Sequence, residues 1–92
     1  MREISDALPG ADLVRRGMAD LAAGRETPEA LLVSIGAPRL RGAGLEVPAP
    51  FPDAGHRLYL LLAKDHGDGA HSQYNALVRR LVSFERALTA GS

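Results

Sequence analysis

The stretch YNALVRRLVSFERAL, residues 74–88, carries the most regular pattern in the chain. Its apolar residues recur at alternating spacings of three and four: Tyr74, Leu77, Leu81, Phe84 and Leu88. That spacing puts side chains on one face of an α-helix, so it predicts a long final helix beginning at Asp68 or Ser72 and ending near Thr89. Two heptads are typical of a packing face in a helical bundle and fall short of a coiled coil.

The residues before this helix predict a second helix that pairs with it. Residues 58–63 are all apolar and predict a centrally placed helix, capped at its N-terminus by Asp53. Gly67 and Gly69 then interrupt the pattern. Because the connection is short, we expect the two helices to form an antiparallel hairpin.

A further helix has the clearest start signal in the chain. Thr27 is a residue typical of an N-cap, and Pro28 is typical of the first helical position. Glu29 places a negative charge in the first turn, where it interacts favourably with the helix dipole. This pattern predicts a helix that Gly36 ends, followed by a separate short turn over residues 38–41.

Residues 42–55 form the one long connection, since Pro48, Pro50 and Pro52 exclude a helix. Long loops of this kind are often functional or mobile. The alternative reading is structural, with the apolar loop residues covering the core and the prolines stiffening the crossing; those apolar residues are Leu45, Val47 and Phe51.

A helix from Pro9 to Ala23, stopped by Gly24, completes the set. The 92 residues are 46% hydrophobic, and Leu and Ala far outnumber the β-branched residues that strands prefer. We therefore expect an all-α fold: one domain over residues 1–92, built as a bundle of four main helices.

Charge and cysteine content narrow the class of protein. Eleven basic and eleven acidic residues cancel, so the field typical of a nucleic-acid binder is missing. The chain has no cysteine, no apolar signal segment after Met1, and no apolar run long enough to span a membrane. These features predict a cytoplasmic protein without a membrane contact. Ten arginines against one lysine are typical of a GC-rich bacterial genome.

The loop over residues 64–71 gathers histidine and carboxylate side chains that suit a divalent metal. His66, Asp68 and His71 are the candidate ligands, and a small enzyme or metal protein is one alternative function. Their spacing matches neither a helical histidine pair nor a calcium loop. We expect an ordinary connection with no metal, no cofactor and no catalytic residue.

Residues 27–41 resemble a helix-turn-helix in outline, with a turn at Gly36. Arg39 and Arg41, together with Arg79 and Arg80, are candidate contacts to nucleic acid or another anion. The second helix of this motif would have about one turn, too short to read a major groove. A nucleic-acid-binding regulator is the first alternative function, ahead of the small enzyme or metal protein.

The favoured function is a non-catalytic interaction or regulatory module that binds through a helical surface to a protein partner. The last two helices hold more apolar side chains than a small bundle needs, which predicts a two-fold homodimer. The candidate self-association face comprises Tyr59, Leu60, Tyr74, Leu77, Leu81, Val82, Phe84 and Leu88. In the competing account, the 42–55 loop seals this surface and the chain is a monomer.

Overall fold

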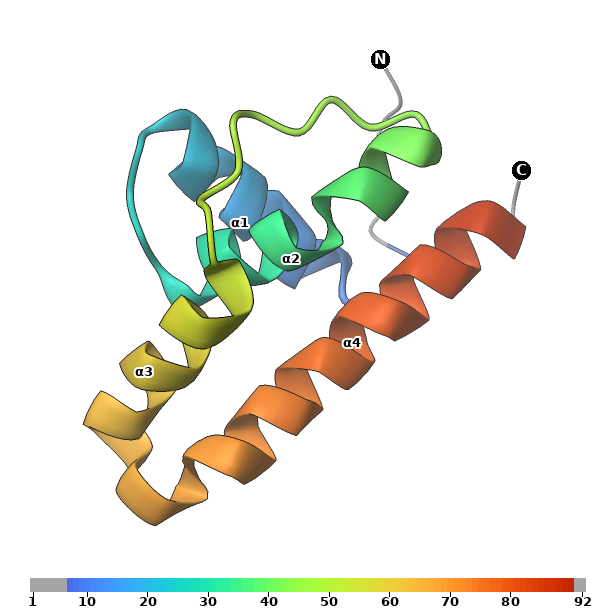
Figure 1. The fold of residues 1–92 in the computed structure, drawn as a ribbon. Helices are drawn as coiled ribbons and strands as arrows, with labels where there is room; N and C mark the ends of the chain where they lie inside the picture. The colour runs from blue at the N-terminus through green and yellow to red at the C-terminus, as the bar shows by residue number, and fades with distance from the viewer. Residues whose placement is uncertain (1–6, 91–92) are drawn as a thin grey trace.

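Helix α2 (Pro28–Gly42) lies at the centre of the computed structural model, which describes residues 7–90 (Figure 1). Helices α1 (Ala11–Ala22), α3 (Ala54–His66) and α4 (Ala70–Ala90) all pack against it. Its buried apolar residues point to several sides of the helix: Ala30, Leu31, Leu32, Val33, Ala37 and Leu40. The described residues contain no strand, so the all-α class is confirmed.

The central position of α2 differs from the sequence-based expectation, which gave that place to residues 58–63. Leu58 and Leu62 of α3 do enter the core, but Tyr59 and Leu60 are exposed. An apolar sequence on every side of a helix is therefore not sufficient for burial. α2 is enclosed because α1, α3 and α4 all pack against it.

Helix α2 begins at Thr27 as predicted, and its N-cap is tied to the end of α1. The Thr27 hydroxyl oxygen accepts a hydrogen bond from the Ala30 amide at 3.1 Å. The same hydroxyl donates to Asp20 at 2.7 Å, and Arg25 donates to the other Asp20 oxygen at 3.0 Å. These bonds, first from Thr27 and then from Arg25, hold the pKa of Asp20 below its usual value. The segment between α1 and α2 is thus held in place by hydrogen bonds from Arg25 and Thr27 to Asp20 of α1.

The predicted break at Gly36 is wrong, because α2 continues through it to Gly42 and includes Pro38. Pro38 has no amide hydrogen to donate, and an interior proline costs about 3 kcal/mol. Burial of Leu40 contributes roughly 1.5–3 kcal/mol in the opposite direction, and the buried Ala37 adds to it. Tertiary packing therefore overrides the local stop signal, and no separate turn over residues 38–41 forms.

Helix α1 crosses α2 closely at Gly17. A Cβ at this position would collide with the Glu29 carbonyl oxygen and with the Val33 side chain of α2. α1 ends at Ala22, one residue before the predicted Ala23, and the predicted stop residue Gly24 follows with a φ of +72°, in the left-handed region. Gly17 thus allows the close contact of α1 with α2, whereas Gly24 allows the chain to turn after α1.

Residues 43–53 cross over the core as the structural reading predicted. Leu45 and Val47 are buried, and Phe51 packs against the core cluster. Arg41 donates to the Val47 carbonyl oxygen at 3.0 Å, and the Phe51 amide donates to the Ser34 hydroxyl at 3.1 Å. Both anchors belong to α2, so the loop lies along the central helix.

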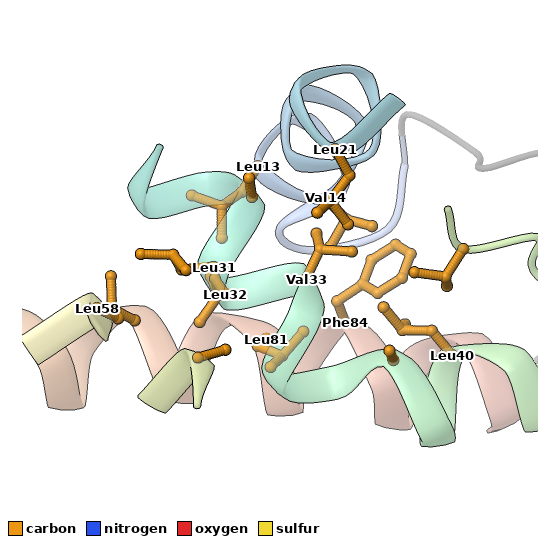
Figure 2. Close-up of a cluster of buried hydrophobic side chains, with 14 of the residues drawn as sticks. Leu13, Val14, Leu21, Leu31, Leu32, Val33, Leu40, Leu58, Leu81 and Phe84 are labelled. Carbon is orange, nitrogen blue, oxygen red and sulfur yellow. The ribbon is translucent and has the colours of Figure 1, made fainter. Parts of the chain in front are cut away.

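Helices α3 and α4 run in opposite directions around a short 3₁₀ turn, η1 (Gly67–Gly69), which confirms the predicted hairpin (Figure 1). The Tyr59 and Tyr74 ring centroids are 6.0 Å apart across it. Farther along α4, Leu81 and Phe84 reach the core beside α2 (Figure 2). Among the helices formed by residues 7–90, none is long and apolar enough to cross a membrane.

The contact at Gly17 predicts the outcome of a matched pair of substitutions. Gly17→Ala should destabilise the fold by about 2 kcal/mol or more, because overpacking forces the two helix backbones apart. Gly42→Ala is the control, since a Cβ there meets nothing within 4 Å, and it should stabilise the fold by about 0.5 kcal/mol. Urea denaturation measures both. Equal effects of the two substitutions would contradict a close crossing at Gly17.

Candidate functional site

Glu85 places a carboxylate inside the contact between α2 and α4. It lies on the packing stripe of α4, between Leu81 and Leu88, and is only 8% exposed. Arg39 of α2 reaches it from the surface, with 3.6 Å between the Nη1 and Oε1 atoms. The Arg39 side chain is 76% exposed, so a solvated cation faces a buried anion.

The second carboxylate oxygen of Glu85, Oε2, is buried and has no hydrogen-bond donor among residues 7–90. It lies against Gly36, where a Cβ would come within 2.9 Å of it. An unpartnered buried acceptor costs roughly 1–3 kcal/mol. Residues that lower stability are often retained for function, so Glu85 marks a candidate functional site between α2 and α4.

Burial raises the pKa of the Glu85 carboxyl above its ordinary value of 4.5, while the Arg39 guanidinium partly opposes the shift. Removal from water disfavours the charged form, and an exposed cation compensates this only in part. The group is thus more easily protonated than a surface glutamate.

A hollow of about 570 Å³ opens beside this ion pair, between the second halves of α2 and α4. Arg39, Glu85 and Arg86 contribute charges to its lining, Val82 is half-buried, and Leu40 and Leu88 lie beneath it as buried core residues. Small-molecule sites typically measure about 300–1,000 Å³ and combine apolar walls with a few polar groups. The hollow has a volume within this range, while little of its apolar lining is open to solvent.

A second, smaller hollow of about 280 Å³ lies along the outer side of α3. Leu60 and Leu61 form its apolar part, and Arg57 and Lys64 stand beside them. Across from α3, Glu26 pairs with Arg57 at 3.5 Å. Unlike the first hollow, which Glu85 lines, this one has only surface side chains as its polar groups.

The four arginines predicted to contact nucleic acid do not form one free group. Arg39 pairs with Glu85, Arg41 donates to the loop, and Arg80 pairs with Asp12 at 3.4 Å. Arg79 is exposed. With α2 continuous and largely buried, residues 27–41 lack both the turn and the exposed recognition helix of a helix-turn-helix.

The predicted self-association face is divided between the core and the surface. Leu81, Phe84 and Leu88 are buried within the chain, so they are not available to a second copy in this fold. Tyr74, Leu77 and Val82 are half-buried. Only two members of the predicted face are largely open to solvent, and both belong to α3: Tyr59 and Leu60.

The histidine loop does not gather a metal site. His66, Asp68 and His71 are all exposed, and within residues 7–90 no three His, Asp or Glu side chains are placed to hold a metal ion. His71 instead lies 3.2 Å from the side-chain nitrogen of Asn75, one turn along α4. The loop serves as the connection between α3 and α4.

Sequence reasoning missed Glu85, although the sequence does carry a signal for it. Glu85 follows Leu81 by four residues and precedes Leu88 by three, so it falls on the apolar stripe. A charged residue at such a position is expected to have a partner. That partner comes from another helix and is invisible in the sequence pattern.

Comparison of the chain with protein-family models, with curated proteins and with solved structures finds no match. Function therefore has to be argued from the geometry and chemistry of the surface itself.

The burial of Glu85 predicts a pH-dependent effect of Glu85→Gln. A carboxyl whose pKa is raised in the fold contributes stability below its ordinary value of 4.5 and loses it as pH rises. The variant should therefore be more stable than the parent at neutral pH, with a gain that shrinks as the pH falls toward 4.5. Urea denaturation at both pH values measures this, and Glu46→Gln controls for the loss of an exposed charge. A gain independent of pH would contradict the assignment.

Proposed function

We propose that this domain is a non-catalytic interaction module that binds a protein partner through the outer face of α3. The supporting observation is the exposure of two large hydrophobic side chains on this helix, Leu60 at 55% and Tyr59 at 40%. Successive helical residues are about 100° apart, so Leu60 lies opposite Leu58, which is in the core. Leu60 thus lies on the side of α3 that faces solvent, where a partner can contact it directly.

The neighbours of Leu60 favour an acidic amphipathic helix as the partner. Arg57, Leu60, Leu61 and Lys64 follow the spacing i, i+3, i+4, i+7, so they share one face of α3 and line the smaller hollow. An apolar side chain of a partner helix can occupy the space beside the leucines. Acidic residues beside that anchor would complement Lys64 and the outer side of Arg57.

Self-association through the same face is a second proposal, and Leu60 supports it because a two-fold axis there would pair the side chain with its own copy. Full burial of a large apolar side chain is worth roughly 1.5–3 kcal/mol, and Tyr59 and Leu60 are already partly covered. Association costs about 4–15 kcal/mol. Glu26 offsets the charge of Arg57 in each copy, so Lys64 is the cation that such a dimer would bring together. We therefore expect only a weak homodimer.

A titration with designed peptides tests the main proposal. The probe is a capped helical peptide with leucine at positions i, i+3, i+4 and i+7 and glutamate elsewhere, and its control has lysine in place of glutamate. The acidic peptide should shift the amide NMR signals of α3, and the basic peptide should not. Leu60→Ala should weaken binding about fivefold or more without loss of stability, whereas Gln73→Ala, at an exposed position of α4, should not. Signals that move only outside α3 would contradict the proposal.

Sedimentation equilibrium tests the second proposal. At micromolar concentration we expect the 9.7 kDa monomer, with a dimer only as the concentration approaches millimolar, because two partly exposed side chains supply little association energy. Leu60→Ala should remove the dimer. A tight dimer that survives Leu60→Ala would place the self-association face elsewhere.

A further inference from the structure

The terminal segment of α4, residues 84–90, is attached to the second half of α2 by a contact that contains a buried charge. Phe84 and Leu88 are fully buried in this contact, and Glu85 is buried beside them. The segment lies at the end of α4 that is farther from the hairpin with α3 (Figure 1). The hollow beside it shows that the two helices are loosely packed here.

The Glu85 carboxylate has little within this contact to compensate its charge. Oε2 lies against Gly36 and has no hydrogen-bond donor in the described part of the chain. Oε1 is 3.6 Å from Nη1 of Arg39, whose side chain is mostly in water, so solvent screens the attraction. A charge removed from water with so little compensation opposes the contact that buries it.

The other charged groups around the terminal segment do not supply the missing compensation. Arg86 lines the same hollow but is exposed. From α1, Asp12 pairs with Arg80, which lies on another side of α4. Up to Ala90, where the described chain ends, the last turn of α4 holds no basic residue that could interact with the helix dipole. Arg39 and Glu85 are therefore the charges that govern this contact.

Detachment of the terminal segment from α2 returns Glu85 to water. Burial raises the pKa of the carboxyl in the attached state, and detachment restores the ordinary value of 4.5. Detachment therefore becomes up to about tenfold more favourable for each pH unit between these two pKa values. Protonation of Glu85 favours the attached state, and ionisation favours the detached state.

We propose that the terminal segment of α4 is a strap whose attachment to α2 is controlled by the ionisation of Glu85. When Glu85 is protonated, the strap stays packed over Leu40 of α2. When Glu85 is ionised, the strap detaches more often while α1, α2 and α3 stay together, and each detachment uncovers Leu40, Phe84 and Leu88. The strap is separate from the outer face of α3, so it does not depend on the protein interaction proposed above.

Amide hydrogen exchange of the intact chain, corrected for the intrinsic exchange rate at each pH, tests the proposal. The end of a helix frays without tertiary packing, so detachment exposes the amides of residues 84–90. At neutral pH these amides should be less protected than those of Leu31, Leu32 and Val33 in the centre of α2. Their protection should rise about tenfold or more as the pH falls toward 4.5. Equal protection of the two segments at neutral pH would overturn the proposal, because the strap would then open only with global unfolding.

Two variants assign the effect to the buried charge. Glu85→Gln should raise the protection of residues 84–90 about tenfold at neutral pH and remove its pH dependence. Arg39→Gln should lower that protection about twofold or more at neutral pH, because the remaining compensation is lost, and should have no effect when combined with Glu85→Gln. Arg79→Gln, at an exposed position of α4, is the control and should change nothing. Protection that still depends on pH in Glu85→Gln would overturn the proposal, since another group would then control the strap.

Discussion

The close packing of α2 against its neighbours is the constraint on which the rest of the structure depends. On one side α1 approaches so closely that only glycine fits at position 17. On another, Gly36 leaves the space that the Glu85 carboxylate of α4 occupies. In both contacts a glycine has no side chain, so a polar group can lie against the helix backbone: the Glu29 carbonyl oxygen at Gly17 and the Glu85 carboxylate at Gly36. The fold of the domain and its most unusual buried group therefore have a common origin.

Local signals in the sequence predicted the elements that local chemistry controls. Thr27 does cap α2, Gly24 does end α1, and the apolar spacing along residues 74–88 does mark a packed helix. Each of these depends on contacts within a few residues of the chain. The same reasoning failed at Gly36 and Pro38, where the stop signal was correct in kind but weaker than the burial of the residues that follow.

The candidate site was less accessible to sequence reasoning, because its parts come from different helices. Arg39 was identified as a residue that contacts an anion, yet its actual partner is Glu85, more than forty positions along the chain. The sequence assigned Leu60, Leu81 and Phe84 to one self-association face, but only Leu60 is exposed, while Leu81 and Phe84 are buried in the packing face that the same spacing predicted. Periodicity assigns residues to a face of a helix but does not say what covers that face.

Most contacts between elements join neighbours in the sequence, namely α1 with α2, α2 with α3, and α3 with α4. A topology dominated by such local contacts is associated with rapid folding. The contact of α2 with α4 is the main exception, and it includes the ion pair of Arg39 with Glu85. Local opening of the last turns of α4 would separate these two residues while α1, α2 and α3 stay together. Amide hydrogen exchange along residues 81–90 thus reports on the contact between α2 and α4 independently of global unfolding.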